Sequence, residues 1–169
     1  MRINLLEPNW QPGLGISNLP TQHFLDIGIK ALILDVDGTL LPRHEKILHD
    51  SVTFWIENAK NFFVIHLLSN NPSKKRIESI AQQLNINFTY KAAKPTRKAL
   101  RNVQEKLQLN PSEIAIIGDR LFTDVLAGNR LGIYTVLVSP LDSDGKPYTK
   151  NKIQLVEKTI AGFLGANKS

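Results

Sequence analysis

The chain of 169 residues contains no cysteine. Disulfide bonds and zinc sites built from cysteine are therefore excluded, and the composition is compatible with a reducing compartment. Long hydrophobic runs are also missing. The longest, Phe62 to Leu68, is interrupted by His66 and is far shorter than the roughly 20 residues that cross a bilayer. The N-terminal segment has no long apolar stretch and is broken by Pro8 and Pro12, which argues against a signal peptide. We therefore expect a cytoplasmic protein.

Acidic residues are scarce in one part of the chain. Residues 71–110 carry nine lysines and arginines and only two acids, so this stretch accounts for the whole formal net charge of +6. Such an imbalance favours anionic partners, such as a phosphate ester, a nucleic acid or an anionic membrane surface. A solvated basic face without a partner is an equally weighted alternative. Because the stretch lacks the interleaved aromatic residues of a single-strand platform, we expect no nucleic acid partner.

No boundary divides the chain. Charge runs, internal repeats, low-complexity segments and stretches rich in proline, glycine or serine are all absent. Hydrophobic residues make up 42% and charged residues 21%, which is ordinary for a globular protein. We therefore predict one domain over residues 1–169. Residues 1–30 form an N-terminal extension that we expect to pack on the core or to lie at a membrane surface.

Short apolar segments alternate with segments of helical periodicity. Strands are expected at residues 31–34, 62–68, 88–90, 114–117 and 133–138. One helix is expected to run to about Lys60 with Asp50 or Ser51 as its N-terminal cap, and another to follow the cap Ser73. Pro95 and Thr96 are expected to open a third helix, and further helices are expected from Thr123 to Gly132 and at residues 151–164. Continuous apolar strands with helices between them predict an α/β fold, a three-layer Rossmann-like parallel sheet with helices on both faces.

Polar side chains follow four of these strands. In chain order they are Asp35, Asp37, Gly38 and Thr39, then Ser69 and Asn70, then Lys94, then Asp119 and Asp124. Ligands of parallel sheets bind at the carboxyl ends of the strands, so we expect these groups to converge. The carboxylates can hold Mg²⁺, while Lys94, Ser69 and backbone amides hold a phosphate. Taken alone, Lys94 could equally be a surface lysine and Ser69 a turn residue.

Phosphoryl transfer explains these residue types. A carboxylate can attack phosphorus in line and form an aspartyl-phosphate, and Asp35 at the end of a buried strand suits this role. A second acid must protonate the leaving oxygen and later activate water, which suits Asp37. Gly38 lets the backbone turn tightly and come close to the phosphate. A metal ion would screen the repulsion between Asp35 and the phosphate dianion.

Other interpretations of single residues remain. An Asp-x-Asp-Gly stretch could be a calcium loop, but that motif requires different residues where Thr39, Leu40 and Lys46 stand. Asp124 could merely cap the helix after the fourth strand. His66 lies inside an apolar strand and is more simply a core histidine with a hydrogen-bond partner.

The four motifs together resemble those of the haloacid dehalogenase (HAD) superfamily of phosphatases. DVDGT, Ser69, Lys94 and GDRLFTD stand at successive strand ends in the order of that superfamily. The resemblance implies that Asp35 is the nucleophile and Asp37 the acid and base. It further implies that the phosphate is bound by Gly38, Thr39, Ser69, Asn70 and Lys94. The implied ligands of Mg²⁺ are Asp35, Asp37, Asp119 and Asp124, the last as a ligand or as the support of one.

A narrower resemblance concerns the substrate. Only residues from Leu41 to about Asp50 separate the first motif from the next helix, which leaves no room for a substantial cap domain. The segments LLEPNWQPGLGISNL, LDIGIKALILD, LSNNPSKKR and GDRLFTDVLAGNR resemble the phosphatidylglycerophosphate phosphatase group of HAD subfamily III. This resemblance implies dephosphorylation of phosphatidylglycerophosphate to phosphatidylglycerol. A phosphatase for a soluble sugar or nucleotide phosphate is the alternative, and a nucleic-acid-associated basic protein ranks third.

A lipid substrate would imply an anionic lipid partner and a peripheral position on the inner face of the membrane. Some apolar residues of the N-terminal extension could enter the interface or pack on the sheet; they are Leu5, Leu6, Trp10, Leu14, Ile16 and Leu19. Lys74, Lys75 and Arg76 could face anionic headgroups, each contributing about 1 kcal/mol near the surface.

Overall fold

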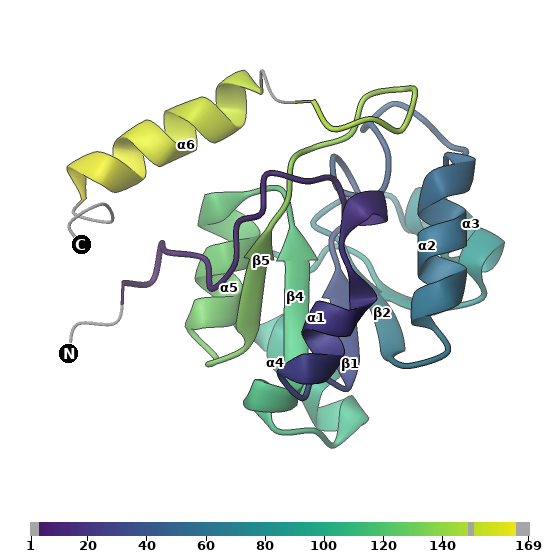
Figure 1. Ribbon diagram of the computed structural model, residues 1–169, viewed down its shortest axis with the longest axis horizontal. Helices are drawn as coiled ribbons and strands as arrows, with labels where there is room; N and C mark the ends of the chain where they lie inside the picture. Colours follow the sequence, from purple (N-terminus) through teal and green to yellow (C-terminus); the bar gives the residue numbers. More distant parts are fainter. Residues whose placement is uncertain (1–3, 149–150, 165–169) are drawn as a thin grey trace.

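Five parallel strands form one sheet in the computed structural model, which describes residues 4–148 and 151–164 (Figure 1). The strands are β1 (Ala31–Leu34), β2 (Val64–Leu68), β3 (Asn87–Thr89), β4 (Ile114–Gly118) and β5 (Tyr134–Leu137). Their order in the sheet is β3-β2-β1-β4-β5. The chain therefore builds one half of the sheet outward from β1 and then returns to build the other half. In such sheets the ligand site lies at the carboxyl ends, where the strand order reverses between β1 and β4.

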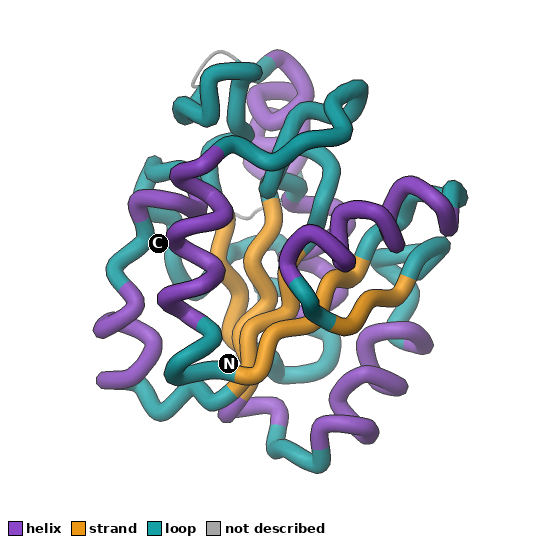
Figure 2. Tube along the Cα trace, turned by 90° about the vertical axis from the view of Figure 1, so that its right-hand side faces the viewer, coloured by secondary structure: helices purple, strands orange, loops and turns teal. Residues whose placement is uncertain are grey.

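Helices cover both faces of this sheet (Figure 2). They are α1 (Thr21–Asp26), α2 (Asp50–Ala59), α3 (Lys74–Leu84), α4 (Lys98–Leu107), α5 (Leu126–Asn129) and α6 (Lys152–Phe163), with shorter turns η1 (Ile16–Asn18), η2 (Pro111–Glu113) and η3 (Leu121–Val125). Helices α1, α2 and α3 pack on one face, and α4 and α5 pack on the other. The predicted three-layer α/β architecture is confirmed, and no cap domain stands over the sheet in the part of the chain that the structure describes. None of the described helices is long and apolar enough to cross a membrane.

Strand β1 shows why the sheet needs helices on both faces. All four of its side chains are fully buried. Leu32 and Leu34 belong to the apolar cluster beneath α2 and α3, while Ala31 and Ile33 belong to the cluster beneath α4. Successive side chains of a strand point to opposite faces, so an unbroken apolar strand must be covered from both sides.

The N-terminal segment packs against the edge of the sheet. The Trp10 N–H donates to the Thr135 carbonyl at 3.1 Å, and the Trp10 carbonyl accepts from the Leu137 N–H at 3.0 Å. This pairing protects the exposed edge of β5. Further along, Ile16 and Leu19 are 0% and 3% exposed within the core. The idea that Ile16 and Leu19 could enter a membrane interface is therefore wrong, because both side chains are already buried in the protein.

Two predicted boundaries around α2 also differ. The strand after it begins at Val64 rather than at Phe62, because Phe62 belongs to the turn that ends α2 and donates its N–H to the Ala59 carbonyl. The N-terminal cap of α2 is His49 and not the predicted Asp50 or Ser51. The His49 Nδ1 atom accepts from the Ser51 N–H at 3.3 Å. An imidazole nitrogen thus fills the role that a carboxylate or hydroxyl usually fills.

The segments next to the carboxyl edge of the sheet depart furthest from the predicted regular helices. Helix α4 begins only at Lys98, since the residues before it form a turn in which Ala93 has a left-handed φ of 56°. The single helix predicted over residues 123–132 is instead a π-helical turn, η3, followed by the short α5. Such π-helical turns are frequent at functional sites, and this one carries Asp124.

Candidate active site

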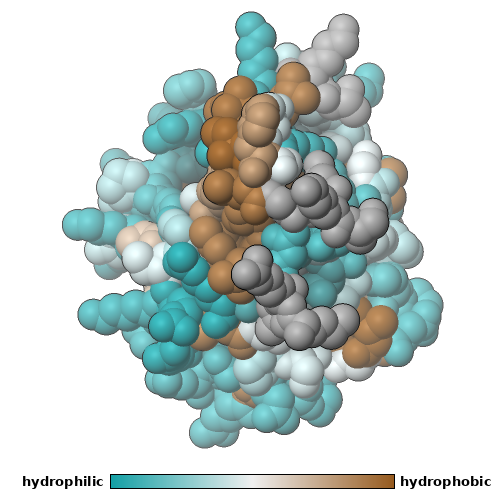
Figure 3. Space-filling model, turned by 90° about the vertical axis from the view of Figure 1, so that its left-hand side faces the viewer, coloured by the Kyte–Doolittle hydropathy of each residue, from teal (hydrophilic) through white to brown (hydrophobic). Residues whose placement is uncertain are grey.

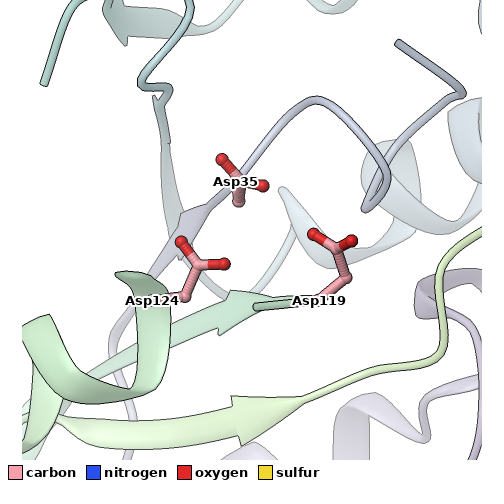
Figure 4. Close-up of side chains that lie close together, drawn as sticks. All are labelled: Asp35, Asp119 and Asp124. Atoms are coloured by element: carbon pink, nitrogen blue, oxygen red, sulfur yellow. The ribbon is translucent and has the colours of Figure 1, made fainter. Parts of the chain in front are cut away.

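Three carboxylates meet at the carboxyl edge of the sheet. Asp35 follows β1, Asp119 follows β4, and Asp124 lies in η3. One oxygen of each lies within 4.8 Å of the others, and all three residues are buried. The three side chains point toward a common space in Figure 4. Like charges packed this closely away from water require compensating positive charge.

Lys94 supplies part of that charge. Its ammonium donates to Asp35 Oδ1 at 2.8 Å, to Asp124 Oδ1 at 2.6 Å and to the Leu68 carbonyl at 2.7 Å. Burial by itself lowers the pKa of Lys94, but the two carboxylates outweigh it and raise that pKa above its usual value. One ammonium among three carboxylates still leaves the cluster short of positive charge.

The shortage of positive charge raises the pKa values of two of the acids. Burial, followed by repulsion from Asp35 and Asp124, raises the pKa of Asp119 well above its ordinary value. Burial and then Asp35 raise the pKa of Asp124 to about 6, although Lys94 opposes the shift. A hard divalent cation bound by carboxylate oxygens would relieve this repulsion. The cluster of Asp35, Asp119 and Asp124 therefore fits a metal ion, both in its donor atoms and in its charge.

Two glycines allow the acids to approach so closely. A Cβ atom at Gly38 would lie 2.5 Å from Asp119 Oδ2, and Gly38 has a φ of 90°, which residues with side chains rarely adopt. A Cβ atom at Gly118 would overlap the side chain of Asp124. The sequence predicts that Gly38 lies close to the phosphate, but it assigns Gly118 no role in the site. A glycine at the end of a strand, directly before an acid, was the signal for a close approach at Gly118.

Asp37 is held by two neighbours outside this cluster. Arg76 donates to Asp37 Oδ1 from Nη2 at 2.7 Å and from Nε at 3.2 Å. Asn71 donates from Nδ2 to Asp37 Oδ2 at 2.7 Å. Both carboxylate oxygens of Asp37 are thus engaged, and this carboxylate is not part of the group of acids that could share a metal ion. Its role as a metal ligand stays a prediction.

Arg76 is a site residue that was expected elsewhere, facing lipid headgroups together with Lys74 and Lys75. Its side chain is only 15% exposed, and its guanidinium also donates to the carbonyls of Pro42 and Glu45. The two lysines are exposed, so the prediction is wrong for Arg76 alone. The available signal was its position in the first turn of the helix that follows a strand-end motif, close to the carboxyl edge of the sheet.

Ser69 and Asn70 follow β2 and have different roles. The buried Ser69 hydroxyl lines the site and accepts from the Asn71 N–H at 3.1 Å. Asn70 accepts from the Lys94 N–H at 2.7 Å and donates to the Lys94 carbonyl at 2.9 Å. Asn70 therefore fixes the backbone that carries Lys94, a contact that the sequence did not predict.

Thr39 lies behind the acids. It is fully buried, and its hydroxyl donates to Asp119 Oδ1 at 3.2 Å. The backbone N–H groups of Gly38 and Thr39 donate to carbonyls of their own loop. The structure thus brings the Thr39 hydroxyl to Asp119 and not to the cavity. Among the described residues, by contrast, the N–H groups of Asp37 and Asn70 meet no protein acceptor, and both residues line the cavity.

These groups lie in an open cavity of about 380 Å³. Besides the motif residues it is lined by Pro42, Arg43, Asn71, Arg120, Thr123, Pro140, Leu141, Tyr148, Asn151 and Ile153. Lys94 lies at its base, and Arg43 and Arg120 add two further cations to its walls. These three cations suit a phosphate, and the size of the cavity suits a small ligand or headgroup.

Helix α6 fixes the loop that carries Asp119. Gln154 donates from Nε2 to the Asp119 carbonyl at 2.8 Å. Glu157, which is 4% exposed, accepts from the Leu121 N–H and from Arg120 Nε, both at 2.9 Å. The sequence predicted this helix without any part in the site. Gln154 and Glu157 are therefore positioning residues that only the structure identifies.

Known proteins with similar sequences are phosphatases. A family model described as mitochondrial PGP phosphatase matches residues 14–141, about three quarters of the chain. The "Probable phosphatase YqeG" of Bacillus subtilis is 32% identical over 149 residues, which cover 88% of this chain and 86% of the relative. The mitochondrial phosphatidylglycerophosphatase GEP4 of Saccharomyces cerevisiae is 26% identical over 182 aligned positions, which cover 96% of each chain.

Solved structures share the fold at lower identity. A Legionella pneumophila protein assigned to subfamily III A of the HAD hydrolases aligns with a TM-score of 0.53 and 17% identity, covering 86% of this chain and 96% of its own. The cobalt-bound deoxy-D-mannose-octulosonate 8-phosphate phosphatase of Haemophilus influenzae aligns with a TM-score of 0.54 and 20% identity, covering 75% of each chain. These likenesses establish the HAD-type arrangement of the sheet and helices.

Proposed function

Because the chain belongs to the PGP phosphatase family of HAD-type phosphatases, we propose that it removes the terminal phosphate of phosphatidylglycerophosphate in a Mg²⁺-dependent reaction through an aspartyl-phosphate. The observation that carries the chemistry is the buried cluster of Asp35, Asp119 and Asp124, in which the first and last accept hydrogen bonds from the Lys94 ammonium. The lipid substrate is supported by the family match and by the relative named a phosphatidylglycerophosphatase, whose alignment covers 96% of both chains. Action at the surface of a membrane is part of this proposal.

The first chemical step forms a bond between a carboxylate oxygen of Asp35 and the phosphorus atom. The bond from phosphorus to the lipid oxygen breaks, and Asp37 gives its proton to that oxygen, which leaves as a hydroxyl. Lys94 and the Ser69 hydroxyl bind the equatorial phosphate oxygens, together with the N–H groups of Asp37 and Asn70. Magnesium held by the acid cluster would neutralise negative charge on the phosphate.

The second step returns the protein to its starting state. Asp37, now a carboxylate, takes a proton from a water molecule whose oxygen attacks phosphorus. The bond from phosphorus to Asp35 breaks, and inorganic phosphate leaves. Arg76 and Asn71 hold Asp37 in place for both proton transfers, since they bind one carboxylate oxygen each. Such positioning matters because small displacements of a reacting group slow catalysis strongly.

The decisive experiment is a comparison of substrates. Phosphate release would be measured with Mg²⁺ on phosphatidylglycerophosphate in mixed micelles and on a panel of sugar and nucleotide phosphates. The lipid is expected to be turned over fastest, with activity abolished by chelation and restored by Mg²⁺. The Asp35→Asn variant should retain its fold and lose all activity, because an amide is a poor nucleophile. Turnover of a soluble phosphate with none of the lipid would replace this proposal by the soluble-substrate alternative.

A further inference from the structure

Helix α6 turns its polar side toward the protein and its apolar side toward solvent. Gln154 and Glu157 face inward with Ala161, which is 3% exposed. Besides Lys152 and Thr159, the outward side carries large apolar residues that are 44% to 88% exposed and are termed here the α6 apolar face: Ile153, Leu155, Val156, Ile160, Phe163 and Leu164. A surface helix of a globular protein normally has the opposite arrangement. The α6 apolar face is therefore suited to contact an apolar environment outside the molecule.

Most of the six residues lie along one side of the helix. Single exposed apolar side chains are ordinary, but contiguous patches mark interaction sites. Ile153, Val156, Ile160 and Phe163 recur at spacings of three and four residues, so they lie along one side of the helix. At a rise of about 1.5 Å per residue, the face from Ile153 to Leu164 is about 17 Å long. Figure 3 shows hydrophobic side chains gathered in a band on this side of the molecule.

This face begins at the catalytic cavity. Ile153 lines the cavity into which Asp35 and Lys94 also project. Figure 1 shows α6 beyond the carboxyl ends of β4 and β5, set apart from the helix layers on the two faces of the sheet. The cavity of about 380 Å³ is large enough for a phosphorylated headgroup but has no room for two acyl chains as well. The acyl chains of a lipid substrate would therefore stay outside the cavity, next to the α6 apolar face.

The charges around the face favour an anionic bilayer as its partner. Glu157, the only acid of α6, is buried and faces inward. Lys152 is exposed at the start of the helix and Lys158 is partly exposed along it, so the accessible charges of α6 are basic. Basic groups near a membrane surface attract anionic lipids. A second copy of the chain seated on the same face would obstruct the cavity at Ile153, whereas a bilayer would deliver the substrate there.

We propose that the α6 apolar face is a membrane-docking surface that enters the interface of an anionic bilayer and brings the catalytic cavity to the lipid headgroups. This placement differs from the one expected from the sequence, where the N-terminal extension and the residues from Lys74 to Arg76 were to meet the membrane. It rests on the proposed lipid substrate for its biological purpose. The docking itself can be tested without any substrate.

The test measures co-sedimentation of the protein with vesicles made of equal parts of phosphatidylglycerol and phosphatidylcholine. The docking variant carries Leu155→Gln, Phe163→Gln and Leu164→Gln. The matched control carries Ile47→Gln, Phe54→Gln and Phe62→Gln, which remove three apolar side chains that are 78%, 72% and 57% exposed outside α6. The docking variant is expected to bind at least tenfold more weakly than wild type, and the control to bind like wild type. All three proteins should hydrolyse para-nitrophenyl phosphate equally, because none of the changed residues touches the site.

A single Phe163→Trp variant gives an independent measurement. Its fluorescence emission, after subtraction of the wild-type signal from Trp10 and Trp55, is expected to shift to shorter wavelength when vesicles are added, because the new indole enters the interface. Three results would each overturn the docking proposal. Wild type would not bind the vesicles, the two triple variants would bind them equally well, or the Phe163→Trp emission would not shift when vesicles are added. Self-association through α6, lost in the docking variant, would overturn it in favour of a second copy. Vesicle binding that depends on α6 without lipid hydrolysis would instead overturn only the proposed substrate.

Discussion

At the scale of single residues, Arg76 is the least expected member of the site. It binds Asp37 Oδ1 through two nitrogens, and its side chain is 15% exposed. We expect Arg76→Ala to lower kcat on a soluble phosphate ester by about 10- to 100-fold with little change in KM, because Asp37, the proposed acid and base, is no longer held in place. Steady-state kinetics would show this. The exposed Lys75→Ala is the control and should leave kcat unchanged. A kcat of Arg76→Ala within twofold of wild type would remove Arg76 from the catalytic machinery.

Gly118 is the second informative residue, because it makes room for Asp124. In Gly118→Ala the new methyl group overlaps the Asp124 side chain, so the acid must move. We expect the Mg²⁺ concentration for half-maximal activity to rise at least tenfold, equivalent to about 1.4 kcal/mol of binding free energy. Gly128→Ala is the matched control, since its Cβ would crowd Thr135 and Ile116 away from the acids. That control should lower the melting temperature while the Mg²⁺ requirement stays as in wild type. Equal Mg²⁺ requirements in both variants would contradict the assignment.

At the scale of elements, α6 acts as a support for the loop between β4 and η3. Its Glu157 accepts hydrogen bonds from Leu121 and from the half-buried Arg120. Replacing the carboxylate by an amide leaves one of these donors without an acceptor and weakens the ion pair, at a cost of about 1–2 kcal/mol after allowance for the exposure of Arg120. Glu157→Gln should therefore lower the melting temperature by about 2–8 °C and raise the Mg²⁺ requirement. Calorimetry and a Mg²⁺ titration of activity would measure the two effects. Glu57→Gln, which weakens an exposed pair with Lys60 on α2, should change neither.

At the scale of the whole molecule, we expect His66 to make the stability of the fold depend on pH. Burial, and to a lesser extent the charge of Lys106, lower the pKa of His66 to about 4 from the ordinary 6.5. In the unfolded chain His66 therefore becomes protonated below about pH 6.5, whereas in the folded protein it becomes protonated only near pH 4. The contribution of neutral His66 to stability is present above pH 6.5 and is lost as the pH falls through this window. The loss amounts to about 1–3 kcal/mol, since the side chain is partly exposed.

The His66→Gln variant isolates this effect, because the other titrating groups are common to both proteins and cancel in the difference. Chemical denaturation at pH 7.5, 6, 5 and 4 should show wild type losing stability relative to the variant as the pH falls. The exposed His44→Gln serves as the control and should follow wild type at every pH. A difference between wild type and His66→Gln that stays constant with pH would show that His66 does not couple folding to protonation.

The sequence alone determined the architecture and the edge of the sheet at which the site residues meet. Unbroken apolar strands such as Ala31–Leu34 can be satisfied only in a sheet covered on both faces, so the three layers follow from local composition. Strand ends of a parallel sheet share one edge, so the convergence of Asp35, Lys94 and Asp119 follows from their places in the chain. These inferences succeed because they depend on periodicity and on topology, which the order of residues encodes directly.

Tertiary structure alone decided how these groups are supported and which surface is left apolar. Arg76 binds Asp37 across 39 residues of sequence, and Asn70 binds Lys94 across 24 residues. Nothing in the local sequence pattern specifies such pairs. The inward turn of Glu157 is equally hidden, because helical periodicity reveals that α6 has two sides but not which one meets the protein. The usual preference predicts that the apolar side is buried, and here hydrogen bonds to the Asp119 loop reverse it. The direction in which a helix faces depends on the partners it finds in three dimensions, and those partners are distant in the chain.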